Sequence, residues 1–166
     1  VMPCLNEAKT IVQCIQEANE FFEKGGLRGE VVISDNGSTD DSVLLAKTYN
    51  AIVVHASEKG YGHACRVGIK AARGEYVFKM EADGTYVCAD IDNFLKKFEN
   101  GHDYVIGSRL RGNILPGAMP FSHRYLGNPV MSLMARVLCR TGISDICCGL
   151  KGFRRSNLTE EDDYLS

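Results

Sequence analysis

EYVFKMEADGTY, residues 75–86, is the segment from which the architecture of this chain is most readily inferred. Its apolar run, residues 76–80, has the length and composition of a buried strand. The run ends at two carboxylates one residue apart, Glu81 and Asp83, and Gly84 then lets the chain turn. Carboxylates just past the carboxyl end of a strand lie where open α/β sheets bind their ligands. Spaced in this way, they can share one hard divalent cation that also binds phosphate oxygens, whereas an isolated pair of this kind is usually a solvated turn.

Predicted strands and helices alternate on both sides of this segment. Apolar runs predict further strands at residues 1–4, 30–34, 51–55 and 104–107. Periodic patterns predict helices at residues 8–24, 90–99 and 129–140, and two more that end at residues 49 and 72. This alternation predicts an α/β fold: a doubly wound, mostly parallel sheet with flanking helices.

The last predicted helix, residues 129–140, is amphipathic. Its apolar face consists of Val130, Leu133, Met134, Val137 and Leu138. We expect this face to pack on the sheet; the alternative is that it lies against a membrane surface. The preceding loop, residues 110–122, is rich in Gly and Pro and has a length typical of lids and binding segments.

Polar loops follow two other predicted strands. Asp35 comes at the carboxyl end of the strand at residues 30–34, just as Asp83 follows the strand at residues 76–80. That two strands end alike in an acid favours a shared site. In the loop after Asp35, the residues Ser38, Thr39 or Asp40 could instead cap the next helix. Near residue 60, glycines allow backbone or Lys59 to approach a phosphate, although the spacing does not fit a dinucleotide fingerprint.

Composition limits the class of protein. The chain has 166 residues, of which 45% are hydrophobic and 24% charged, as expected for one globular domain. Its formal net charge is −2, and an acidic run at residues 160–163 contributes four negative charges, so the body is nearly neutral and no nucleic-acid binding is expected. Seven scattered cysteines without a C-x-x-C pair argue against a disulfide framework and a zinc site, and favour a reducing compartment.

The first residues, Val1-Met2-Pro3, have the pattern of a strand already under way. The sequence contains no signal peptide and no apolar run long enough to span a bilayer. We therefore expect a catalytic domain at residues 1–155, an acidic tail at residues 156–166, and flanking segments outside this chain: the first strand residues and a C-terminal membrane segment.

Several motifs together resemble family 2 inverting glycosyltransferases. Met2-Pro3-Cys4-Leu5-Asn6-Glu7 is similar to that family's opening P-x-x-N-E, and DNGSTD at residues 35–40 resembles its D-[DN]-G-S-T-D loop. Residues 73–76 and 81–83 resemble its A-x-G-[DE]-Y and D-A-D segments. Later motifs resemble the polyprenyl-phosphate sugar transferases, the relatives of dolichyl-phosphate mannosyl- and glucosyltransferases; these motifs are residues 107–109, 116–120, 123–129 and 145–155. The resemblance runs in order through roughly residues 1 to 155.

The resemblance implies a GT-A fold, which is a Rossmann-like sheet, and a site with defined parts. The donor, of the UDP-glucose or GDP-mannose class, would be bound by Pro3, Leu5, Asn6, Glu7, Asp35, Asn36, Gly37, Lys59 and Gly60. Glu81 and Asp83 would be catalytic residues that hold Mg²⁺ or Mn²⁺ on the diphosphate. Arg109 and Arg124 would bind the phosphate of a lipid acceptor, because guanidinium groups suit phosphate oxygens.

Asp145 is the candidate general base. The alternative interpretation, which is at least as well supported, is that this carboxylate supports the fold. Glu81 stands where relatives usually carry Asp; it remains a good hard-cation ligand, so we expect metal binding to be kept. The implied enzyme moves a hexose to a polyprenyl (dolichyl or undecaprenyl) phosphate on the cytoplasmic face of a membrane, while this fragment itself is expected to be soluble. Homo-oligomerisation remains open.

Three rival functions are considered. A family 2 glycosyltransferase with a glycan or other acceptor is one, although the Q-x-x-R-W signature of processive synthases is absent. A nucleotide-sugar pyrophosphorylase would need a G-x-G-x-R loop after the first strand, and residues 3–7 do not resemble it. A degenerate domain that binds a nucleotide-sugar without turnover is the non-enzyme alternative, and Glu81 is the feature that favours it.

Overall fold

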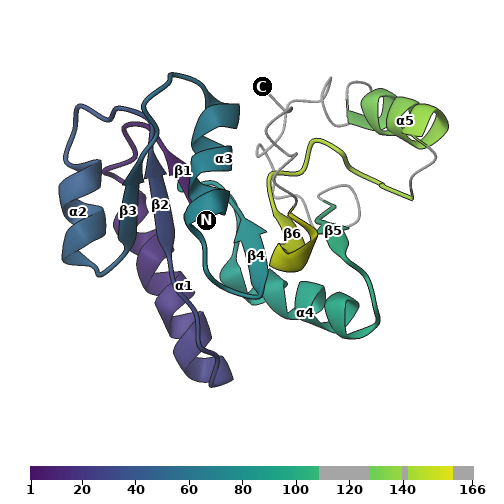
Figure 1. The fold of residues 1–166 in the computed structure, drawn as a ribbon, viewed down its shortest axis with the longest axis horizontal. Helices are drawn as coiled ribbons and strands as arrows, with labels where there is room; N and C mark the ends of the chain where they lie inside the picture. The colour runs from purple at the N-terminus through teal and green to yellow at the C-terminus, as the bar shows by residue number, and fades with distance from the viewer. Residues whose placement is uncertain (109–127, 140–141, 159–166) are drawn as a thin grey trace.

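Six strands form the centre of this computed structural model, which describes residues 1–108, 128–139 and 142–158. One group of three pairs in parallel with β2 in the middle: β1 (Met2–Cys4), β2 (Val32–Asp35) and β3 (Ile52–His55). The other three pair antiparallel with β6 in the middle: β4 (Tyr76–Lys79), β5 (Tyr104–Ile106) and β6 (Lys151–Arg154). Figure 1 shows the two groups beside each other.

Val1 links the two groups of strands. Its backbone nitrogen donates a hydrogen bond to the Phe78 carbonyl (2.7 Å), and its carbonyl accepts one from the Met80 N–H (3.0 Å). This is the pattern of a parallel bridge between β1 and β4. Because β4 and β5 are both antiparallel to β6, they are parallel to each other. All strands except β6 therefore run in one direction, which confirms the predicted mostly parallel sheet.

Helices cover both faces of the sheet, as the predicted doubly wound architecture requires. The helices that cover it are α1 (Ile11–Gly25), α2 (Ser42–Thr48), α3 (Tyr61–Ala71) and α4 (Ile91–Glu99), and the described residues also include the 3-10 turns η1 (Cys88–Asp90) and η3 (Arg155–Asn157). One core lies under α1, α2 and α4, where Ile15 and Phe98 are fully buried in the same cluster as Ile33. A second, smaller core lies under α3 and contains Val32 and Val77. Successive strand residues such as Val32 and Ile33 thus point to opposite faces.

The predicted helices are present, with ends that differ by a few residues. Helix α1 begins at Ile11 instead of residue 8, because the preceding loop is bonded to other loops. It ends at Gly25, and the C-cap residue Gly26 has a φ of 61°, the left-handed conformation that glycine adopts readily.

Strand β6 was not predicted from the sequence. It inserts between β4 and β5, and its Gly152 lies against aromatic rings: a Cβ there would stand 2.9 Å from Phe94 Cδ1 and 3.0 Å from Phe78 Cδ1. The segment K-G-F-R has one glycine and two cations in four residues, which is a weak strand signal on its own. Arg154 is accommodated because it lies over the Tyr76 ring, 5.0 Å from its centroid.

Helix α5 (Asn128–Cys139) occupies the predicted position, but its apolar face is exposed. The exposed fractions on this face run from 45% at Val130 to 73% at Leu138. The helix is attached through its opposite side, where the Ser132 hydroxyl accepts a hydrogen bond from the Ile146 N–H (3.2 Å) and Arg136 Nε donates to the Ile143 carbonyl (2.7 Å). The expectation that this face packs on the sheet is therefore wrong. In Figure 1, α5 lies at the edge of the molecule, well away from β1, β2 and β3.

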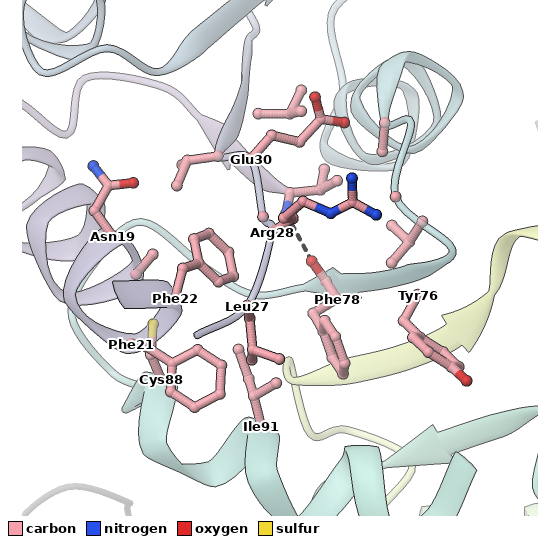
Figure 2. A pocket seen from close by; sticks show the side chains of 18 of the residues that line it. Asn19, Phe21, Phe22, Leu27, Arg28, Glu30, Tyr76, Phe78, Cys88 and Ile91 are labelled. Atoms are coloured by element: carbon pink, nitrogen blue, oxygen red, sulfur yellow. Dashed lines mark hydrogen bonds between the residues drawn. The ribbon is translucent and has the colours of Figure 1, made fainter. Parts of the chain in front are cut away.

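A large cavity of about 1110 Å³ lies at the amino-terminal ends of β2 and β4. Figure 2 shows its mixed lining, in which the apolar Phe22, Leu27, Phe78 and Ile91 lie beside the polar Asn19, Arg28 and Glu30. It is at the opposite end of the strands from the predicted carboxylates, away from the edge where open α/β sheets bind their ligands. None of the described helices is both long enough and apolar enough to cross a membrane.

Candidate active site

A second cavity, of about 230 Å³, lies at the carboxyl ends of β1, β2 and β4. It is lined by Pro3, Cys4, Leu5, Glu7, Asn36, Tyr61, Ala64, Glu81, Ala82 and Asp83. Three loops that are far apart in the sequence thus meet around one space, at the edge where open α/β sheets bind ligands. Six of the residues singled out from the sequence are in this lining, including both members of the acid-x-acid pair.

The acidic pair is held in a defined loop. Asp83 Oδ1 accepts a hydrogen bond from the Thr85 N–H (2.9 Å), and Gly84 turns the chain with a φ of 78°. Between the two acids, the Ala82 carbonyl accepts a hydrogen bond from the Thr10 hydroxyl (2.7 Å), which ties the loop to the start of α1. The Asp83 side chain is exposed, and the Glu81 side chain is 35% exposed.

These two carboxylates suit a divalent cation that is shared with a substrate. Among the described residues, no group of three or more His, Cys, Asp and Glu side chains is placed to hold a metal ion alone. Mg²⁺ in nucleotide sites is typically held by one or two carboxylates, with the remaining ligands supplied by phosphate oxygens and water. Glu81 and Asp83 fit that donor set.

Lys79 and Tyr61 complete a polar network with Glu81 that the sequence analysis missed. Lys79 is only 6% exposed, and its Nζ lies 3.8 Å from Glu81 Oε1 and 3.2 Å from the Gly149 carbonyl, to which it donates. The Tyr61 hydroxyl accepts a hydrogen bond from Lys79 and donates one to Glu81 Oε1 (3.1 Å). Burial lowers the pKa of Lys79, and Cys65 and Glu81 nearby partly oppose that shift. A lysine inside an apolar strand, two residues before the acid pair, was the available signal.

Asp35 is buried at the end of β2, where local donors satisfy its carboxylate. The Gly37 N–H donates to Oδ2 (3.1 Å) and the Ser38 N–H to Oδ1 (3.1 Å), while His55 Nδ1 is 3.5 Å from Oδ2. Burial raises the pKa of Asp35, but the hydrogen bonds outweigh burial and hold the pKa below its usual range. Asp35 lies next to the cavity-lining Asn36 without lining the cavity itself.

The loop after β1 is fastened to the loop after β2. Asn6 adopts a φ of 59°, and its side-chain oxygen accepts a hydrogen bond from the Thr39 N–H (2.8 Å). Asp40 accepts from the Ala8 N–H (3.1 Å) and also from the Ser42 N–H at the start of α2 (3.0 Å). Asn6 and Asp40 therefore shape the walls of the cavity. The N-cap of α2 is Asp41 instead of Ser38, Thr39 or Asp40, although Asp40 accepts from the N–H of the first helical residue.

Asn36 fastens the loop after β3 in the same way. Its Oδ1 accepts a hydrogen bond from the Gly60 N–H (2.8 Å), and its Nδ2 donates to the Glu58 carbonyl (2.6 Å). Gly60 has a φ of 137°, which other residues rarely adopt. Lys59 and Gly60 are exposed and, like Gly37, do not line the cavity.

The remaining predicted site residues are Asp145, Arg109 and Arg124, and the structure describes only Asp145 among them. Asp145 is fully buried and does not line the cavity. It opens the segment that leads to Gly149, whose N–H donates to the Tyr86 hydroxyl (2.6 Å) and whose carbonyl is bonded to Lys79. Arg109 and Arg124 lie outside the described residues, as does the acidic run at residues 160–163.

A family model described as glycosyl transferase family 2 matches residues 1–160. The chain belongs to this family. It is 38% identical over 156 residues to the low-salt glycan biosynthesis hexosyltransferase Agl6 of Haloferax volcanii, covering 93% of this chain and 38% of that protein. It is 29% identical over 174 residues to human dolichyl-phosphate beta-glucosyltransferase, covering 93% of this chain and 54% of that protein. The chain thus spans about half or less of these relatives.

Solved structures agree on the fold of this family 2 domain. Mannosyl-3-phosphoglycerate synthase from Rubrobacter xylanophilus superposes with a TM-score of 0.72 at 19% identity, covering 93% of this chain and 51% of that one. Glucosyl-3-phosphoglycerate synthase from Mycobacterium tuberculosis, in complex with Mn²⁺, UDP and glucosyl-3-phosphoglycerate, gives 0.71 at 21% identity, covering 93% and 55%. The predicted GT-A fold is confirmed.

Proposed function

We propose that this family 2 domain is the catalytic part of a metal-dependent inverting glycosyltransferase that transfers a hexose from a UDP- or GDP-sugar to a polyprenyl phosphate. The observation that carries the proposal is the cavity in which Glu81 and Asp83 face the Pro3–Glu7 loop and Asn36. Such a cavity presents carboxylates for a cation on one side and backbone and amide groups for a nucleotide on the other.

The donor is held, in this proposal, by the loops that follow β1, β2 and β3. Pro3, Leu5, Glu7 and Asn36 line the cavity and would contact the nucleotide. The other predicted donor residues, which do not line it, would act through loop shape: Asn6, Asp35, Gly37, Lys59 and Gly60. Because these loops are bonded to one another, the nucleotide meets walls that are already formed.

The chemistry needs charge stabilisation on the leaving nucleotide. A divalent ion held by Glu81 and Asp83 would supply positive charge to the diphosphate as the bond to the sugar breaks. Glu81 and Asp83 would hold that ion at the carboxyl end of β4. The two acids thus act as catalytic residues through the diphosphate, while the acceptor oxygen attacks from the opposite side of the sugar and inverts its configuration.

The acceptor is proposed to be a lipid phosphate, bound through its anion by Arg109 and Arg124. A phosphate is already an anion at pH 7, so the reaction does not strictly require a strong general base. Full burial of Asp145 favours its role as a support of the 145–150 segment over that of a base. The exposed apolar face of α5 gives the domain a surface that suits the cytoplasmic face of a membrane, where such a lipid is found.

Calorimetric titration of the chain with UDP, GDP, UDP-glucose and GDP-mannose, each with Mn²⁺ and with EDTA, tests the donor site. We expect one nucleotide class to bind in a metal-dependent manner. Asp83→Asn should weaken that binding at least about tenfold. Asp92→Asn, an identical change at an exposed position on α4, is the matched control and should bind as the parent chain does. Equal loss in both variants, or no binding of any nucleotide, would contradict the proposal.

The acceptor is tested separately by sugar transfer from the nucleotide-sugar that binds. Polyprenyl phosphate in detergent is the expected acceptor. 3-Phosphoglycerate is the comparison, because the solved neighbour from M. tuberculosis carries glucosyl-3-phosphoglycerate. If sugar is transferred to 3-phosphoglycerate and not to polyprenyl phosphate, the acceptor is a small phosphorylated molecule and the lipid proposal is wrong. Metal-dependent binding of a nucleotide-sugar without transfer to either would favour a binding module.

A further inference from the structure

The buried Lys79 ammonium stands behind the acid pair and serves no part of the proposed reaction directly. It is 6% exposed and does not line the cavity, whereas Tyr61 and Glu81, the side chains that it contacts at the cavity wall, do. A buried ammonium is costly unless it is paired. A lysine on a strand that is otherwise apolar therefore needs a partner whose charge or position the ammonium group stabilises.

A hydrogen bond and an ionic contact converge on one oxygen of Glu81. Oε1 accepts the Tyr61 hydroxyl hydrogen bond at 3.1 Å and lies 3.8 Å from Lys79 Nζ. Lys79 also donates to the same Tyr61 hydroxyl, and its Nζ lies 4.7 Å from the centroid of the Tyr61 ring. Gly149 closes the back of this network, because its carbonyl accepts from Lys79 at 3.2 Å.

The length of Glu81 is the property that allows this arrangement. Within residues 1–108, 128–139 and 142–158, Asp83 is hydrogen-bonded to its own turn, through the Thr85 N–H. Glu81 instead reaches back towards α3 and β4. A side chain one methylene shorter would bring its carboxylate less far towards Tyr61 and Lys79.

We propose that Lys79 is a positioning residue that, with Tyr61, holds Glu81 at the cavity wall and balances its charge, so that Asp83 is the principal carboxylate for the divalent ion. This inference rests on the proposed function, because it concerns the same metal and nucleotide site. Its consequence is that Lys79 keeps the affinity for the metal low: a fixed positive charge close to a divalent cation opposes binding of that cation.

Mn²⁺ affinity, measured by electron paramagnetic resonance of free Mn²⁺ with and without UDP, tests this directly. Lys79→Met removes the charge and keeps an unbranched side chain of similar length, and we expect Mn²⁺ to bind about tenfold more tightly. Tyr61→Phe keeps the ring and loosens Glu81, so it should give a smaller increase of about twofold. Lys47→Met, at an exposed position on α2, is the matched control and should change nothing.

The two acids should respond differently in the same assay. Glu81→Gln should lower Mn²⁺ affinity by less than about threefold, because its charge is already balanced, whereas Asp83→Asn should lower it at least about tenfold. In the Lys79→Met background, Glu81→Gln should become costly. Unchanged Mn²⁺ affinity in Lys79→Met, or equal losses in Glu81→Gln and Asp83→Asn, would overturn the inference.

Titration with UDP in EDTA distinguishes this positioning role of Lys79 from direct binding of the diphosphate. If Lys79 contacted the diphosphate itself, Lys79→Met would weaken UDP binding without metal and would not tighten Mn²⁺ binding, and this result would also overturn the inference. A parent chain that binds Mn²⁺ but no nucleotide would instead refute the proposed function. In that case the Mn²⁺ titrations without UDP still decide the role of Lys79.

Discussion

Asp35 shows how a single buried charge is tolerated in this fold. It ends β2 at 5% exposure, and its two oxygens receive the N–H groups of Gly37 and Ser38. Those bonds require the tight turn that Gly37 makes with a φ of 92°. The residue that begins the D-N-G-S-T-D motif therefore orders the wall of the cavity before any ligand is bound.

Asp35→Asn should lower the free energy of unfolding by about 2 kcal/mol at pH 7, because an amide cannot accept both N–H groups as a carboxylate does. The pKa of Asp35 is held low in the folded state, so its stabilisation is complete above the ordinary carboxyl pKa of about 4 and is lost as pH falls through the lower folded value. Urea unfolding of both proteins should show a difference that is constant near neutral pH and shrinks towards pH 3. A difference that grows on acidification would contradict the assignment.

At the scale of residues, the sequence made it possible to predict which polar side chains lie at the carboxyl ends of strands. Glu81, Asp83 and Asn36 lie at the cavity because strand ends in a parallel sheet meet at one edge. Lys79 and Tyr61 could not be paired from the sequence, because their contact depends on how α3 lies over β4. The meeting of the two carboxylates and Asn36 at one cavity was thus predictable, and the network behind Glu81 was not.

At the scale of elements, β6 shows how tertiary contacts can override a weak local signal. Pairing on both sides satisfies the backbone hydrogen bonds of β6, and the absence of a side chain at Gly152 lets the Phe78 and Phe94 rings approach.

Gly152→Ala should destabilise the fold by about 1–3 kcal/mol, because two packed rings must move. Urea unfolding measures this loss. Gly62→Ala is the control, since a Cβ at that position in α3 meets no atom within 4 Å and alanine favours a helix. Equal stability of the two variants would contradict the packing argument.

Helix α5 was predicted in its place, but not with the correct face inside. Periodicity identifies an apolar face without saying what covers it, and here the side with Ser132 and Ala135 is buried instead. We expect Val137→Ser/Leu138→Ser to weaken co-sedimentation of the chain with anionic vesicles at least about tenfold, since each inserted side chain contributes about 1.5–3 kcal/mol. Leu44→Ser, at an exposed leucine on α2, should leave co-sedimentation unchanged. Vesicle binding that is insensitive to the α5 change would place the membrane contact elsewhere.

At the scale of the whole molecule, the alternation of strands and helices was enough to predict the sheet, because connections between parallel strands leave few possible topologies. The order of β4, β6 and β5 was not predictable, since it depends on a strand that returns from the far end of the chain. The same long-range assembly makes the candidate site: Thr10 is bonded to Ala82, and the Glu7 N–H donates to the Ser42 hydroxyl (2.8 Å). The site therefore exists only in the folded chain.

A ligand that contacts these loops together should stabilise the entire fold. Binding at about 100 times the dissociation constant adds about 2.7 kcal/mol, which corresponds to a rise in Tm of about 5–10 °C for a chain of this size. We expect UDP or GDP with Mn²⁺ to give this rise in a thermal melt, and EDTA to remove it. Asp83→Asn should reduce the ligand-dependent rise to about half or less, because a tenfold weaker ligand adds only about 1.4 kcal/mol at the same concentration. Asp92→Asn should keep the full rise. A full rise that survives both EDTA and Asp83→Asn would mean that the nucleotide binds without the acid pair, because a carboxylate-held cation would then add nothing to its affinity.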